Sequence, residues 1–212
     1  MLHVAWRIAV HRRLYLNSLG FAESGSTVGR TTCRRITMSQ TDSEELIFPS
    51  QAWFEKYKQR INDNDQYEEL GSDWGVDFNG DFIFEMREMP IDDLDTEAMP
   101  EFLHEEIDTY VSDENGTHVG YAFLGLEGGK CTEARFIESE DEVDAGFKLI
   151  ADNETWKQLM TGELGVVDGM MSGHFDIEGD MQKVMQYSQA AVQLTESAAD
   201  IDAVYADDEF SA

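Results

Sequence analysis

Residues 162–195 carry the clearest pattern in the chain and read GELGVVDGMMSGHFDIEGDMQKVMQYSQAAVQLT. The pattern predicts a short helix broken by glycine, then a brief strand, then a long amphipathic helix. Phe175 and Ile177 share one face of the strand, because successive side chains of a strand point to opposite faces. Asp180 is placed to cap the long helix. The inward face of that helix repeats at three- and four-residue steps and is rich in methionine: Met181, Val184, Met185, Ser188, Ala191, Val192 and Thr195.

This order of elements resembles the sterol carrier protein type two lipid-binding domain. That family ends in a short helix with a tryptophan, a glycine, a second short helix, a strand, a glycine turn and a C-terminal helix. The resemblance is clear over residues 146–195 and only topological over 75–137. The family's Gly-Lys-Leu is replaced by Gly173, His174 and Phe175, an exchange that fits an acid-rich surface. The matching residues are Trp156, Leu159, Gly162, Met170, Met171, Gly173, Phe175, Ile177, Gly179, Asp180 and Met181.

Charge divides the chain into two segments. Residues 1–37 hold six arginines and one glutamate, whereas the residues from Met38 onward hold 43 acidic and nine basic side chains. The first segment has no apolar run suited to a membrane span or a secretory signal. We therefore expect a basic leader over residues 1–37 that is not part of the fold, with Met38 as the true start. A targeting segment is the alternative.

The acidic remainder is expected to form one folded domain. Acidic tails are predicted over residues 38–48 and, as a flexible segment, over 205–212, with the domain itself over 49–204. Disordered acidic chains are poor in aromatic residues, whereas this segment holds three tryptophans and many phenylalanines. Self-repulsion at such charge destabilises a compact state in dilute buffer. We therefore expect a halophile-type protein of a high-salt cytoplasm.

Further signals predict an α+β fold. Ser50 is placed to cap a first helix whose Trp53, Phe54, Tyr57 and Ile61 share one face. Helices, then strands, then helix, strand and helix indicate a mainly antiparallel sheet covered by helices. The resemblance implies five strands, helices over one face and an apolar tunnel between them. The other expected elements are a helix over 65–73, one long strand over 75–88 bent at Gly80, a helix over 100–111, and strands over 117–126, 130–137 and 146–151, with a hairpin turn at 127–129.

Methionine and aromatic residues are concentrated where the sheet and the C-terminal helices should meet. Apolar stripes at helical spacing are usually plain core, so core packing stays open as the alternative to a tunnel. Methionine adapts to a ligand because its side chain is flexible, and the resemblance also favours a tunnel. The expected lipid-binding residues are Phe84, Phe123, Trp156, Met160, Met170, Met171, Met181, Val184 and Met185.

The expected function is non-catalytic binding, storage or transfer of a lipid-like molecule, such as an isoprenoid, a fatty acyl chain or a sterol. The alternative is a protein-interaction module or homodimer that uses the same apolar groove. Nucleic acid is excluded as a partner because phosphate backbones need lysine and arginine. Contact with an anionic membrane is expected to be transient at most, for the same reason of charge.

No catalytic, cofactor or metal-binding residue is predicted. The segment from Gly125 to Lys130 lacks the spacing of a phosphate loop and indicates a hairpin. The histidines are too scattered for a metal site, namely His104, His118 and His174. Cys131 is a lone thiol in the acidic segment, which fits a reducing cytoplasm.

Overall fold

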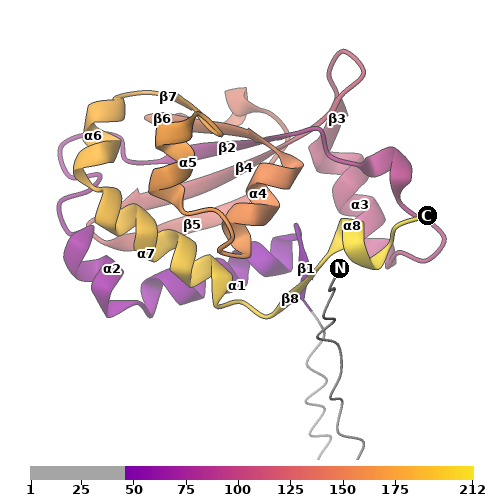
Figure 1. The fold of residues 1–212 in the computed structure, drawn as a ribbon, viewed down its shortest axis with the longest axis horizontal. Helices are drawn as coiled ribbons and strands as arrows, with labels where there is room; N and C mark the ends of the chain where they lie inside the picture. The colour runs from indigo at the N-terminus through magenta and orange to yellow at the C-terminus, as the bar shows by residue number, and fades with distance from the viewer. Residues whose placement is uncertain (1–45) are drawn as a thin grey trace, which may run out of the picture. The chain divides into compact units, whose positions relative to one another are not determined.

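The computed structural model describes residues 46–212 (Figure 1). The basic leader expected over residues 1–37 lies outside the described residues, as does most of the acidic tail expected over 38–48. The elements follow in this order: β1 (Leu46–Phe48), α1 (Gln51–Asn62), α2 (Asp65–Leu70), β2 (Phe82–Arg87), a 3-10 helix (Ile91–Asp93), α3 (Glu101–Tyr110), β3 (Val111–Asp113), β4 (His118–Glu127), β5 (Lys130–Ile137), a 3-10 helix (Glu140–Glu142), β6 (Phe147–Asp152), α4 (Asn153–Met160), α5 (Val166–Ser172), β7 (Asp176–Glu178), α6 (Met181–Gln186), α7 (Ser188–Ala199), β8 (Ala203–Tyr205) and α8 (Ala206–Glu209).

Six strands form the main sheet, in the order β3-β4-β2-β6-β7 with β5 also paired to β4. β3 pairs with residues 118–120 of β4, and β5 pairs with residues 121–127 along the same edge. The six strands therefore occupy five positions across the sheet. The β2–β6 pair is parallel and the other pairs are antiparallel. The α+β class and the mainly antiparallel sheet are confirmed, with one strand more than the expected five.

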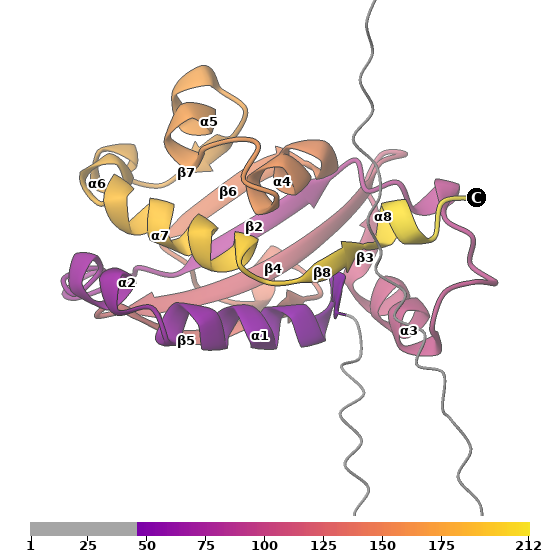
Figure 2. The ribbon, with the colours of Figure 1, turned by 60° about the horizontal axis from the view of Figure 1, so that its bottom comes forward.

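The helices cover one face of this sheet, as expected (Figure 2). Phe84 of β2, Ala122 of β4 and Leu149 of β6 point into the core under the helices. Their neighbours Ile83 and Phe123 belong to a smaller apolar cluster on the opposite face. The two-residue alternation of the strands thus separates a helix-covered face from a second face.

Helix α1 forms as predicted and lies along β5. Ser50 caps it, and the predicted apolar face is buried. The side-chain amide of Asn62 bonds both backbone groups of Cys131, donating to its O at 2.9 Å and accepting from its N at 2.8 Å. Gln51 Oε1 accepts from Phe136 N at 3.2 Å. Because these bonds occupy backbone groups of β5, α1 covers the outer edge of the sheet.

The prediction of one long strand over residues 75–88 is wrong. Strand β2 begins at Phe82, and residues 75–81 form a loop. Gly75 and Asp77 adopt left-handed φ angles of 73° and 66°, which a strand cannot contain. The Trp74 indole N–H closes the loop by donating to Gly80 O at 2.7 Å.

The long C-terminal helix expected after Asp180 is divided into α6 and α7. The division falls at Tyr187, whose φ of −101° and ψ of 23° leave the helical range. The Tyr187 ring packs edge-on against Trp74, with 5.2 Å between the ring centroids.

The flexible tail expected over residues 205–212 is instead structured. Strand β8 pairs in parallel with β1, and Ser211 forms an antiparallel bridge with Leu94. Ala206 of α8 is buried against Ile47 and Leu103. These apolar contacts extend the fold beyond residues 49–204 at both ends.

Candidate functional site

An apolar cavity of about 70 Å³ lies between the sheet and the helices above it. Helices α1, α4, α5, α6 and α7 and strands β2, β6 and β7 all contribute to its wall. The lining residues are Tyr57, Phe82, Phe84, Leu149, Trp156, Leu159, Met160, Val166, Met170, Ile177, Val184, Ala191, Leu194 and Thr195.

Strand register builds the floor of the cavity. Phe84 of β2 lies beside Leu149 of β6, and Leu149 lies beside Ile177 of β7. Residues that are partners across neighbouring strands point to the same face. Three consecutive strands therefore place an apolar side chain in one row under the helices.

Short helices build the roof. Asp152 caps α4 by accepting from Thr155 N at 2.7 Å, and Trp156 anchors the helix by donating its indole N–H to Glu85 O at 3.1 Å. Helix α5 lies close to the strand that follows it, because Gly169 leaves room for the Phe175 ring. A Cβ atom at Gly169 would lie 2.3 Å from that ring, so this close packing requires glycine.

Two smaller apolar cavities continue the first one along the layer between sheet and helices. One, of about 30 Å³, shares Phe82 and Val184 with it and is bounded by Trp74. The other, of about 10 Å³, shares Trp156 and Met160 with it. The first cavity therefore shares lining residues with each of the other two, and the three adjoin one another between the sheet and the helices.

The polar atoms of the lining all have partners within the protein. The Tyr57 hydroxyl donates to Leu194 O at 3.2 Å, and burial raises the pKa of this phenol well above its usual value. Thr195 Oγ1 donates to Val192 O at 2.9 Å. The described residues contain no buried side-chain polar atom without a hydrogen-bond partner. The cavity wall therefore offers a ligand apolar contact without a free hydrogen-bond donor.

Five of the nine residues predicted from the sequence line this cavity. They come from β2, α4, α5 and α6, which the fold brings together from distant parts of the chain. These residues are Phe84, Trp156, Met160, Met170 and Val184.

The other four predicted residues lie elsewhere. Phe123 is on the opposite face of the sheet, because it alternates with its inward neighbours on β4. Met171 is 76% exposed, since it follows Met170 on α5 and points away from the wall. Met181 and Met185 are 39% and 36% exposed, whereas Val184 on the same helix is buried.

Several lining residues are predicted from the sequence to face inward but are not among the nine predicted lipid-binding residues. Ala191 and Thr195 belong to the predicted inward face of the C-terminal helix, and Ile177 to the inward face of its strand. Tyr57 was predicted on the buried face of the first helix. No local signal shows that α1 reaches the cavity, because this contact depends on the packing of α1 against α7.

Ser172 and His174 lie beside each other at the C-terminal end of α5. Ser172 Oγ is 2.7 Å from His174 Nδ1 and also contacts the carbonyl oxygen of Asp168. Within residues 46–212, no group of three or more histidine, cysteine or carboxylate side chains is placed to hold a metal ion. None of the helices in this range is both long and apolar enough to cross a bilayer.

Comparison with known proteins agrees with this architecture. The model of the SCP-2 sterol transfer family matches residues 92–192. A crystal structure of sterol carrier protein 2 is similar, with 23% identity and a TM-score of 0.53 over 72% of this chain and 97% of that chain. A solution structure from Thermus thermophilus, of a conserved hypothetical protein described as a candidate sterol carrier protein, has 23% identity and a TM-score of 0.52 over 73% and 89% of the two chains. No curated protein matches the chain in sequence.

The solved structures and the family model support different conclusions about this chain. At 23% identity, the two solved structures support the fold. The family match spans the elements from α3 to the first part of α7 and so includes β6, α4, α5, β7 and α6, which line much of the cavity. Over residues 92–192 the chain is therefore similar to the SCP-2 sterol transfer family, and its fold is that of the two solved structures.

Proposed function

We propose that this domain binds a lipid-like apolar molecule between its sheet and its helices, for transfer or storage and without chemical conversion. The observation that supports the proposal is the apolar cavity under α4, α5 and α7, which adjoins two smaller apolar cavities. Burial of each methylene group of a ligand contributes about 0.8 kcal/mol. A chain of several carbons could therefore bind tightly without any polar contact.

Binding requires the first cavity to widen. Pockets for small molecules usually measure about 300–1,000 Å³, whereas the cavity under α4, α5 and α7 measures about 70 Å³. Met160 and Met170 lie at its wall and are flexible side chains that can adopt other rotamers. Separation of α7 from α4 and α5 would open the first cavity, whose wall these three helices share, and the same motion would release the ligand.

Native mass spectrometry of the full chain purified in molar salt tests the proposal, combined with organic extraction of bound molecules. We expect a discrete co-purifying lipid of defined mass. A protein that carries no lipid and also fails to take up the neutral apolar dye Nile red would contradict the proposal.

The alternative is an interaction module, and the exposed methionines favour it. Met171, Met181 and Met185 lie on helices α5 and α6, and exposed methionines are common at adaptable binding surfaces. Light scattering at several protein concentrations separates the two functions when it is read beside dye uptake. A stable dimer that binds no dye would support the interaction module, whereas a dye-binding monomer would support the lipid-binding function.

A further inference from the structure

The apolar cavity is uncharged although the protein around it is strongly acidic. Residues 46–212 contain 40 acidic and nine basic side chains. None of the 14 lining residues carries a charge at neutral pH. Within the described residues, the positions of these nine basic side chains therefore determine whether an anionic ligand finds a counter-ion.

The helices that cover the cavity hold two basic residues, and both are engaged elsewhere. Residues 153–202 contain two lysines, Lys157 and Lys183, and no arginine. Lys157 Nζ lies 3.1 Å from Asp207 Oδ2 and 2.6 Å from Asp208 Oδ1. Lys183 Nζ lies 3.6 Å from the ring centroid of Phe78, which is outside the cavity wall. Both ammonium groups thus make their contacts away from the cavity.

Basic residues of the sheet are paired elsewhere. Arg87 and Lys148 bind Glu85 on the face of the sheet opposite the helices. On β5, Lys130 pairs with Glu68 at 2.7 Å, and Arg135 pairs with two glutamates.

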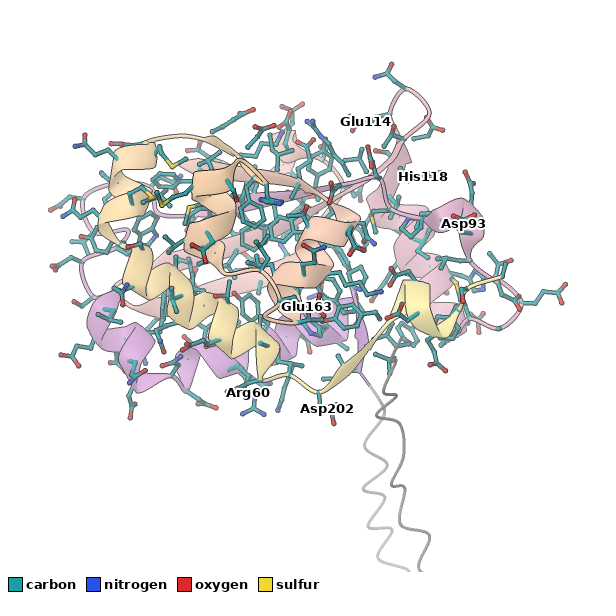
Figure 3. The ribbon with its side chains drawn as sticks, in the orientation of Figure 1. Arg60, Asp93, Glu114, His118, Glu163 and Asp202 are labelled. Atoms are coloured by element: carbon teal, nitrogen blue, oxygen red, sulfur yellow. The ribbon has the colours of Figure 1, made fainter. Side chains whose placement is uncertain are left out.

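Helix α1 carries the three remaining basic residues, which are not part of the cavity wall. Lys58 binds the carbonyl of Thr132. Arg60 extends from the edge of the molecule (Figure 3), where it borders a separate polar pocket with Asp63 and Asp65. Lys56 is the third, and like the other two it lies outside the lining.

We propose that the cavity selects apolar molecules whose polar end carries no negative charge, an inference that rests on the proposed lipid-binding function. A carboxylate or phosphate buried among the lining residues would lose its hydration without gaining a hydrogen-bond donor. At the rim it would meet the negative field of the acidic domain. A hydroxyl or other neutral end can stay at the rim without this repulsion. The ligand class is therefore a neutral chain or ring system, such as an alcohol.

Competition between two ligands with the same chain tests the inference. Dodecan-1-ol and dodecanoate differ in the charge of one end, and each can compete with Nile red for the full-length protein near pH 8. We expect dodecanol to displace the dye at a concentration at least tenfold lower than dodecanoate in dilute salt. The ratio should fall in molar KCl, because the screening length shrinks to about 3 Å at 1 M.

Thr195 offers a matched pair of variants, since it lines the cavity from α7 and is only partly buried. Thr195→Lys places an ammonium group at the cavity. It should lower the ratio of dodecanol affinity to dodecanoate affinity at least threefold. Thr195→Gln adds a long neutral side chain and should leave the ratio of the two affinities unchanged. Dodecanol binding by each variant reports whether the cavity is intact.

The outcomes separate the two proposals. Equal competition by dodecanoate and dodecanol in dilute salt would overturn the inference of charge selection and leave the lipid-binding function in place. A preference that neither salt nor Thr195→Lys alters would also overturn it. Failure of Nile red and of both ligands to bind would remove the proposed function itself.

Discussion

Neighbouring residues of this chain have opposite surroundings, and the geometry of their element decides which one lines the cavity. Met170 and Met171 are 7% and 76% exposed. Successive residues of a helix are rotated by about 100°, so two adjacent methionines cannot share one face. On β4 the same holds for Phe123 and Leu124, which point to opposite faces of the sheet.

A pair of glutamine substitutions tests this difference at Met170 and Met171. Met170→Gln places an unpartnered amide in the cavity and should cost about 1–3 kcal/mol of unfolding free energy and at least tenfold in Nile red affinity. Met171→Gln should change stability by less than about 0.5 kcal/mol and leave binding intact. Urea unfolding and dye titration measure both effects. Equal loss of dye binding in the two variants would contradict the assigned cavity wall.

The buried thiol of Cys131 should make the free energy of unfolding depend on pH. Burial raises the pKa of its thiol to about 12 from a usual value of 9.0, so the folded protein keeps this proton where the unfolded chain loses it. The stabilising contribution is therefore complete below about pH 9 and is lost as the pH rises towards 12. The free energy of unfolding should fall between about pH 8 and pH 10, and in Cys131→Ala this fall should be smaller by roughly 1 kcal/mol. An unchanged pH profile in urea unfolding would contradict the assigned shift.

At the scale of elements, the C-terminal segment holds α4 in place. Asp207 and Asp208 of α8 bind Lys157 of α4, and α4 contributes Trp156 and Met160 to the cavity wall. The segment also covers the apolar cluster that contains Ile47. These contacts link the end of the chain to the roof of the cavity.

Removal of residues 206–212 should therefore destabilise the domain by about 1–3 kcal/mol, because it uncovers buried side chains and removes an ion-pair partner. The double variant Asp207→Asn and Asp208→Asn is the control for the ion pairs alone, which should contribute about 0–1 kcal/mol. Thermal unfolding by circular dichroism measures both. A truncated protein as stable as the full chain would show that these contacts contribute nothing.

At the scale of the whole molecule, charge repulsion opposes the compact state. The described residues carry 40 acidic against nine basic side chains. Ion pairs involve Arg87, Lys130, Arg135, Lys148 and Lys157, which leaves most carboxylates without a basic partner. Stability should consequently depend on screening by salt.

The melting temperature should rise from dilute buffer to molar KCl. Each kcal/mol of relieved repulsion raises the melting temperature of a domain of this size by about 2–4 °C. Calorimetry in increasing KCl measures the effect, and equal ionic strength in NaCl controls for a specific ion. Full thermal stability and a single monomeric species in low-salt buffer would contradict the expected dependence on high salt.

Local patterns predicted much of the fold but only part of the cavity wall. Ser50, Trp53 and Tyr57 indicated α1 directly, because a cap and a helical repeat need only nearby residues. The loop before β2 has the sequence pattern of a strand, because the alternation of phenylalanines continues through residues 75–81, where Gly75 and Asp77 have left-handed backbones. Tyr57 could not be assigned to the cavity, since its hydroxyl reaches Leu194 across 137 positions of sequence.

Local patterns are enough to predict the α+β class, the faces of most strands and the helix caps Ser50 and Asp180, and composition gives the acidic character. Caps and strand faces depend on residues that lie within a few positions of one another. Tertiary packing is needed to show that Met170 faces the cavity while Met181 and Met185 face solvent, and that residues 205–212 belong to the fold. These features depend on contacts such as Tyr187 with Trp74, which form when distant segments pack together and which no local pattern records.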